Sequence, residues 1–217
     1  MEIQILHLEK DFVMCLKPSG VLSQTGKEGE NTMISLLSSQ LGGDIYPVHR
    51  LDREVGGVMV YARTQKAASA LSKLIQEGKM KKEYLAAVNG APEADSGVFE
   101  DLLLHDARKN KSYVVSRMRG GVKKARLSYQ VLGKEEDKTL VQVRLFTGRS
   151  HQIRVQFASR RMPLVGDGRY GGGSGKIALW SVLLSFPHPG RKEMCTFSHL
   201  LDNLGGFTEI PELADMD

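Results

Sequence analysis

Residues 49–62 have the sequence HRLDREVGGVMVYA, a charged segment that runs through two glycines into an apolar strand. Its carboxylate, Asp52, has arginines at positions 50 and 53 and a histidine at position 49. Nearby positive charge favours the ionised form of a carboxylate, which is then able to act as a nucleophile or a base. The glycine pair leaves room for close approach. A surface ion pair before a strand is the alternative interpretation from residue types alone.

A strand, a helix and a second strand are predicted directly after this charged segment. The apolar run through Val60 is the first strand. Thr64 is a predicted N-cap, and the apolar residues that follow it at helical spacing stop before Gly78. Residues 84–88 form the next predicted strand, and the lysines in front of it are consistent with a plain solvated rim.

The residues before the charged segment predict one strand and one short helix. Residues 12–16 are the strand, and Lys17-Pro18-Ser19-Gly20 after it has the composition of a turn. Lys17 therefore stands at a strand end, where a solvated turn lysine is the alternative to a functional one. Asn31 and Thr32 predict the start of the helix, and the glycines from Gly42 predict its end.

Positive charge is concentrated in one part of the chain. Residues 108–126 contain eight lysines or arginines and no acidic residue, whereas the last residues are rich in Asp and Glu. This segregation indicates a side of the molecule that faces a polyanion, although the net charge of +5 is moderate. Gly120 and Gly121 predict a mobile hairpin or connecting loop that lies along a phosphate backbone, with Lys123 and Lys124 beside it. A solvated basic loop explains the same pattern.

A hairpin and a second polar segment follow. Residues 127–132 and 139–146 alternate as antiparallel strands, with a polar tip at 133–138. Ser150 is the predicted N-cap of a helix in which His151 and Arg154 share a face. Arg149 and the free N–H groups of the first turn would form an anion site there. A surface amphipathic helix is the alternative.

The composition excludes several classes of protein. With 217 residues and 41% hydrophobic content the chain forms a sizeable core, and the simplest architecture is one α+β domain rich in antiparallel strands. Cys15 and Cys195 have no disulfide or metal-ligand spacing, so we expect reduced thiols and no metal. The apolar runs are too short to span a bilayer and the N-terminus lacks a signal core, which predicts a cytoplasmic protein. The glycines at 166–175 match no P-loop.

Five motifs in order resemble those of the RNA pseudouridine synthases that modify large-subunit ribosomal RNA and tRNA. They are Lys17-Pro18-Ser19-Gly20, His49-Arg50-Leu51-Asp52, Lys82-Glu83-Tyr84, residues 148–155 and residues 163–167. The resemblance implies the pseudouridine synthase fold, an antiparallel-rich mixed sheet flanked by helices and loops. It implies a single catalytic domain over residues 1–217 with no N-terminal S4 domain, and we expect a monomer.

The resemblance also implies a reaction and roles for individual residues. The enzyme would cleave the glycosidic bond of a uridine in RNA, turn the base and rejoin it through C5, without metal or small-molecule cofactor. Asp52 would be the catalytic aspartate, Arg154 would pair with it, and Tyr84 would stack on the flipped base. Arg50 would fill the space that the extruded nucleotide leaves. The remaining RNA contacts would be Lys17, Arg149, His151, Lys123 and Lys124.

Two departures from the family pattern keep an alternative open. Val55-Gly56-Gly57 stands where the family usually has Thr-Ser-Gly, and Leu179-Trp180-Ser181 stands where a His commonly follows the Leu. If the first change disables the pocket, the chain would be a noncatalytic RNA-binding or ribosome assembly factor on the same fold. A hydrolase that uses Asp52 as nucleophile is the weaker alternative, since metal ligands and a second acid are lacking.

Overall fold

The computed structural model describes residues 1–24 and 31–216. The chain divides into two compact units, each assembled from two stretches of sequence. The first unit contains Met1–Lys82 and Ser181–His199, and the second contains Glu83–Trp180 and Leu200–Asp217. Among the described residues, no helix combines the length and the apolar character needed to cross a membrane.

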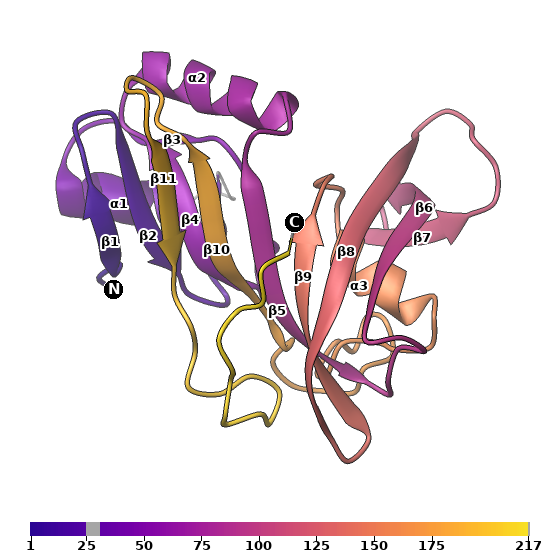
Figure 1. Ribbon diagram of the computed structural model, residues 1–217. Coiled ribbons are helices and arrows are strands. Elements are labelled where there is room, and N and C mark those ends of the chain that lie inside the picture. Colours follow the sequence, from indigo (N-terminus) through magenta and orange to yellow (C-terminus); the bar gives the residue numbers. More distant parts are fainter. Residues whose placement is uncertain (25–30, 217) are drawn as a thin grey trace. The chain divides into compact units, whose positions relative to one another are not determined.

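The first unit is a sheet whose strands follow the order β1-β2-β4-β10, with β3 beside β4 and β11 beside β10 (Figure 1). The strands are β1 (Ile5–Leu8), β2 (Phe12–Lys17), β3 (Tyr46–Pro47), β4 (Gly56–Ala62), β10 (Leu179–Pro187) and β11 (Met194–Ser198). Every residue of β2 and β4 is buried. Strands covered on both faces have continuous apolar runs, which explains why neither strand alternates.

Two helices complete the first unit, and both begin where the sequence predicts. In α1 (Met33–Leu41), the Thr32 hydroxyl accepts a hydrogen bond from the N–H of Ser35, whose side chain bonds back to the Thr32 N–H in a capping box. In α2 (Gln65–Gln76), Thr64 accepts from the N–H of Ala67. The α2 helix packs against β3 and β4. The predicted N-caps are confirmed.

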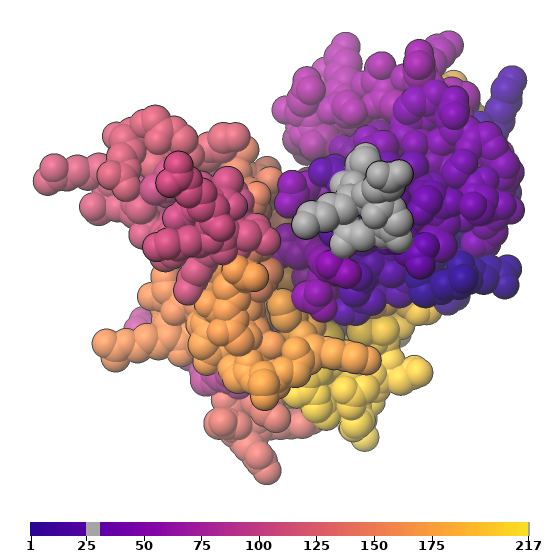
Figure 2. Space-filling view, turned by 180° about the vertical axis from the view of Figure 1, so that it is seen from behind, coloured from indigo at the N-terminus to yellow at the C-terminus, as the bar shows by residue number. Residues whose placement is uncertain are grey.

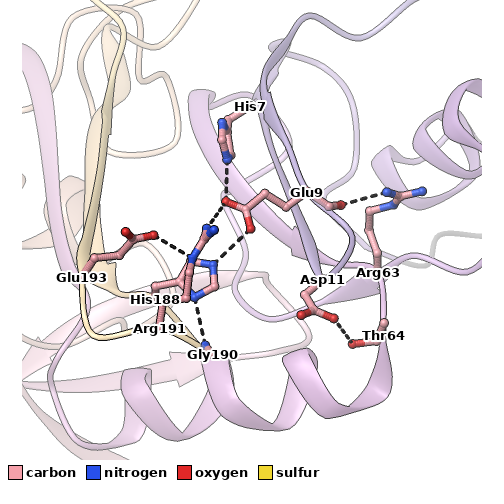
Figure 3. A network of polar contacts seen from close by, with 9 residues as sticks. All are labelled: His7, Glu9, Asp11, Arg63, Thr64, His188, Gly190, Arg191 and Glu193. Carbon is pink, nitrogen blue, oxygen red and sulfur yellow. Dashed lines mark hydrogen bonds and ion pairs between the residues drawn. The ribbon is translucent and has the colours of Figure 1, made fainter.

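A carboxylate, that of Glu9, joins three segments of the first unit (Figure 3). Its Oε1 lies 2.8 Å from His7 Nε2 and 2.6 Å from Arg191 Nη2, and its Oε2 lies 3.1 Å from His188 Nε2. The N–H of Gly190 donates to His188 Nδ1, so the proton of the neutral ring sits on Nε2 and points at Glu9. Hydrogen bonds from His7 and His188, with Arg191, lower the pKa of Glu9 to about 2.

The second unit is a sheet with the strand order β5-β9-β8-β6-β7, all paired antiparallel. The strands are β5 (Lys81–Asn89), β6 (Ser96–Asp106), β7 (Lys111–Val115), β8 (Val122–Glu135) and β9 (Lys138–Leu145). One helix, α3 (Gln152–Ala158), packs on one face of the sheet, where the ring of Phe157 meets Phe99 and Tyr129 at centroid distances of 5.1 and 5.9 Å.

The basic segment is strand on both sides of a short connection. The connecting loop predicted at Gly120-Gly121 is present at residues 116–121. Residues 111–115 form a hairpin with the preceding strand β6, and residues 122–126 pair with the other edge of β6. Neither of these two strands was predicted from the sequence. The predicted hairpin tip at 133–138 is too long: β8 and β9 pair as far as Glu135 and Lys138, which leaves a two-residue turn at 136–137. A register shift after Val131 accommodates the added pairs.

The start of α3 differs from its prediction as well. The helix begins at Gln152, and its N-cap is His151 in the left-handed region at φ 54°, without a side-chain capping bond. Ser150 is not the cap. Its carbonyl instead accepts a 2.6 Å hydrogen bond from the Ser112 hydroxyl of β7. The predicted anion site at a Ser-capped helix start is therefore not formed as expected.

Candidate active site

Lys17 closes β2 and holds the segment that carries Asp52. The Lys17 side chain is fully buried, and its ammonium donates to three backbone carbonyls. These are the carbonyls of Pro18 at 2.9 Å, Arg53 at 2.9 Å and Val55 at 2.6 Å. Burial lowers the pKa of Lys17 to about 8, so the amine is protonated at neutral pH and supplies three N–H donors for three acceptors. The predicted RNA contact at Lys17 is wrong, because the group is enclosed by protein.

Two serines after Lys17 fasten the same segment. Ser23 Oγ donates to the carbonyl of Leu51 at 2.8 Å and accepts from the Leu51 N–H at 3.0 Å. Ser19 Oγ donates to the carbonyl of Glu54 at 2.7 Å. The backbone is thus held immediately before and after Asp52, whose side chain is half-buried. A catalytic group on a backbone that is held in this way stays close to its productive orientation.

His49 and Arg50 differ sharply in their surroundings. Arg50 is exposed, whereas His49 is half-buried and its Nε2 accepts a 3.2 Å hydrogen bond from the Val60 N–H. Burial, with a smaller effect of Lys82, lowers the pKa of His49 to about 3. His49 is therefore neutral, and our expectation that it adds positive charge beside Asp52 is wrong.

The structure explains part of the departure from the family sequence pattern. Gly57 has φ 124°, and a Cβ atom built there would lie 2.2 Å from the carbonyl oxygen of Ser181. The Ser181 hydroxyl donates to the Val58 carbonyl at 3.0 Å, so this contact joins β10 to β4. Val55 is 2% exposed, and its carbonyl is an acceptor for Lys17. In this chain the valine is therefore a core residue that also helps to hold the loop.

Tyr84 lies in β5 with 6% of its surface exposed. It is opposite Val143 of β9, which in turn is opposite Tyr129 of β8. Paired residues share a face of the sheet, so Tyr84 is on the face that α3 covers. Its neighbour Glu83 points to the other face, where Gln142 Nε2 donates to it at 2.7 Å.

Arg154 is fixed in the second unit by a carboxylate to which the sequence analysis assigned no role. Its Nε donates to Asp167 Oδ2 at 2.7 Å, and its Nη2 donates to Asp167 Oδ1 at 2.9 Å. Both side chains are nearly buried, with 6% and 1% exposure. A bidentate pair sets both the position and the plane of the guanidinium. The guanidinium carbon also lies 5.2 Å from the centroid of the Tyr170 ring.

Tyr170 joins the start of α3 to strand β7. Its hydroxyl lies 2.9 Å from His151 Nδ1 and accepts from the N–H of Ser112 at 2.8 Å. Burial raises the pKa of Tyr170. Figure 2 shows the pink surface from the middle of the chain, which includes β7, against the orange surface of residues 150–170. The predicted polar residue His151 is therefore part of a packed network, with 7% of its surface exposed.

The turn before α3 is attached to the edge of β8 beyond the end of β9. Arg149 Nε donates to the Lys124 carbonyl at 2.9 Å, and Gln152 Nε2 donates to the Arg126 carbonyl at 3.0 Å. Gln152 Oε1 also accepts from the Arg149 N–H at 3.0 Å. Hydrogen bonds from these side chains therefore replace those of a partner strand along β8, beyond the end of β9. Arg149 remains half-exposed.

Lys123 and Lys124 are both exposed but lie on opposite faces of β8. The next residue, Ala125, is buried in a cluster with Val155 of α3. Successive residues of a strand alternate between faces, so Lys123 shares the face of α3 and Lys124 points away from it. The two lysines therefore contact different surroundings.

Comparison with known proteins identifies the family. The sequence model of the family described as RNA pseudouridylate synthase matches residues 11–159. The chain belongs to this family. As a pseudouridine synthase it is an isomerase that acts on uridine in RNA.

Relatives of the pseudouridine synthase match most of the chain. It is 36% identical over 194 residues to the dual-specificity RNA pseudouridine synthase RluA of Vibrio vulnificus, covering 83% of this chain and 76% of the relative. It is 29% identical over 228 residues to tRNA pseudouridine synthase C of Vibrio parahaemolyticus, covering 94% and 92%. The structure of human RNA Pseudouridylate Synthase Domain Containing 1 has a TM-score of 0.78 at 20% identity, covering 93% and 84%. This likeness confirms the predicted α+β fold.

The residues predicted for this pseudouridine synthase fall in both units. Arg50 and Asp52 belong to the first unit, and Tyr84, Arg149, His151 and Arg154 belong to the second. Three positioning residues were missed by the sequence analysis: Asp167, Tyr170 and Gln152. Asp167 and Gln152 each left a signal in the sequence, as members of the motifs at residues 163–167 and 148–155.

Proposed function

We propose that the chain isomerises a uridine of structured ribosomal or transfer RNA to pseudouridine, with Asp52 as the catalytic aspartate. The observation that carries this proposal is the way in which the Asp52 segment is held. A buried ammonium and two serine hydroxyls fix its backbone. A surface ion pair would not need such support, because exposed ion pairs contribute little to stability.

The proposed role of Arg154 is to hold and orient the Asp52 carboxylate. A guanidinium has five N–H donors, and Asp167 engages one on Nε and one on Nη2. Because the bidentate pair with Asp167 fixes the guanidinium of Arg154, this cation is suited to bind a second carboxylate in a defined position. Asp52 would then be oriented for its reaction at the uridine.

The proposed roles of Tyr84 and Arg50 follow from their contrasting exposure. Tyr84 is buried in a strand and offers a fixed ring on which a flipped uracil stacks. Arg50 is exposed and long enough to enter the stack of the RNA in place of the extruded nucleotide. Such contacts offset the few kcal/mol that unstacking a base costs. Arg149, His151, Lys123 and Lys124 are the proposed RNA contacts of the second unit.

A tritium-release assay tests the proposed function. Unmodified ribosomal RNA and tRNA transcripts that carry tritium at uridine C5 are incubated with the protein, and released tritium is counted. We expect release with the wild type and loss of at least a thousandfold in Asp52→Asn, which retains size but not charge. Asp44→Asn is the matched control, since Asp44 is exposed and contacts only Tyr46 among the contacts described here.

Two results would overturn the proposal in different ways. Release absent with every transcript, while RNA is still bound, would favour the noncatalytic RNA-binding factor. Release retained in Asp52→Asn would remove the aspartate from the mechanism but leave the reaction in place. Light scattering of the protein at assay concentration tests the accompanying proposal that it acts as a monomer.

A further inference from the structure

Phe146 follows the last residue of β9 and is 41% exposed. Most other phenylalanines of the chain, such as Phe12 and Phe157, are buried. A single exposed apolar side chain needs no explanation. Phe146 differs because two cations lie over it: the guanidinium carbons of Arg126 and Arg144 are 4.8 and 5.2 Å from the ring centroid.

Both guanidiniums are themselves held in place. Arg126 Nε lies 3.2 Å from Glu100 Oε1 on the neighbouring strand. Arg144 Nη1 donates to the carbonyl of Met216, in the C-terminal segment that runs beside β9 (Figure 1). The arginines are therefore pre-oriented around the ring, which lowers the entropy that a ligand must remove on binding.

The cluster lies on the sheet face opposite α3. Successive residues of a strand point to opposite faces of the sheet. Val143 and Ala125 are on the face that α3 covers, so their neighbours Arg144 and Arg126 are on the other face. Lys124 is on the same face as Arg126 by the same alternation. This face therefore has three cations and one exposed aromatic ring. Glu100 pairs with Arg126, and the buried Glu83 of β5 is opposite Arg144.

The backbone connects the cluster to the turn before α3. The Phe146 N–H donates to the Arg126 carbonyl at 3.1 Å, and the Arg126 N–H donates to Thr147 Oγ1 at 2.9 Å. The next cation along the chain, Arg149, donates to the Lys124 carbonyl at 2.9 Å. A ligand on Phe146 would thus lie near Arg149, one of the proposed RNA contacts.

We propose that Phe146, Arg126 and Arg144 bind an unpaired nucleotide of the RNA substrate. The inference rests on the proposed function and adds a site to it. Bases stack on aromatic rings and guanidinium planes without regard to sequence, while arginines also contact the phosphates. The three cations complement the negative charge of the RNA backbone. The cluster binds RNA outside the residues that carry out the reaction.

The test compares RNA binding by variants of the full chain. The probes are a single-stranded RNA oligonucleotide and the duplex of the same sequence, each labelled for fluorescence anisotropy. Phe146→Leu keeps an apolar side chain but removes the ring. We expect about five- to a hundredfold weaker binding of the single strand, an unchanged affinity for the duplex, and restored binding in Phe146→Tyr. The matched control is Tyr113→Leu, which removes an aromatic ring that is 37% exposed on β7.

Salt dependence separates stacking from charge. Arg126→Gln and Arg144→Gln should each reduce the slope of log affinity against log salt by about one, whereas Phe146→Leu should leave the slope unchanged. Equal affinities of Phe146→Leu and wild type for the single strand would overturn the inference. An equal loss on single strand and duplex would overturn it too, because a paired base offers no free face. Tritium release by the wild type is measured in parallel, so failure of this site is distinguished from failure of the proposed reaction.

Discussion

Replacing Lys17 with methionine separates the stability of the fold from the placement of Asp52. Methionine retains most of the length of the buried side chain and removes its charge. Three hydrogen bonds are lost, and bonds from a charged donor contribute about 1.5–3 kcal/mol each. The lowering of the Lys17 pKa from 10.5 to about 8 shows that the buried charge itself costs about 3 kcal/mol, which the substitution relieves.

The two effects partly oppose each other in the free energy of unfolding. We therefore expect Lys17→Met to lower this free energy by about 1–6 kcal/mol. Activity should also fall, because the carbonyls of Arg53 and Val55 lose the donor that positions them on either side of the loop. Misplacement of a catalytic group by about 1 Å costs on the order of a hundredfold in rate.

Urea unfolding and tritium release on the same preparations measure the two effects. Lys10→Met is the matched control, since Lys10 is exposed in the same unit and should change neither quantity appreciably. A turnover number within twofold of wild type for folded Lys17→Met would refute the reasoning. It would mean that the contacts of Ser19 and Ser23 are enough to hold the Asp52 segment. The buried ammonium of Lys17 would then contribute to the stability of the fold but not to the position of Asp52.

Three further outcomes follow from the same structure. Asp167→Asn removes the charge that fixes Arg154, and we expect kcat to fall at least tenfold with the KM for RNA nearly unchanged; a change in KM alone would contradict this role. Glu9→Gln should lower the free energy of unfolding by about 1–2 kcal/mol at pH 7. Because the pKa of Glu9 is lowered from 4.5 to about 2, this difference should disappear as the pH falls through that range, and a difference in urea unfolding that persists at pH 2 would count against it. The rate of the wild type should fall as the pH rises through about 8, where Lys17 loses a proton and its third donor; a constant rate up to pH 9.5 would exclude this.

Local patterns were enough to predict the scaffold of the first unit. The caps at Thr32 and Thr64 depend on residues within one helical turn, and the structure has both. The strand around Val60 also follows from its own apolar run, as does the strand around Tyr84 in the second unit. These features could be predicted because each depends on interactions between neighbours in the sequence.

Features that depend on distant partners could not be predicted in the same way. Lys17, followed by a Pro-Ser-Gly turn, resembles a solvated lysine, and two of its three acceptors lie 36 and 38 residues further along the chain. Residues 122–126 resemble part of a basic loop until β6 is present to pair with them, because their partners lie 18 to 26 residues earlier in the chain. Arg154 was identified, but its partner Asp167 lies 13 residues further along the chain, beyond the end of α3.

The choice of partners for Lys17 has an electrostatic reason beyond packing. A carboxylate could have neutralised the buried ammonium, but it would have placed a second negative charge next to Asp52 and repelled it. Backbone carbonyls satisfy the three N–H donors. Glu54 and, less strongly, Asp52 raise the pKa of Lys17 against the effect of burial, so the ammonium attracts both carboxylates of the segment. With His49 neutral, Lys17 thus places a positive charge behind the proposed catalytic aspartate, although it precedes Asp52 by 35 residues.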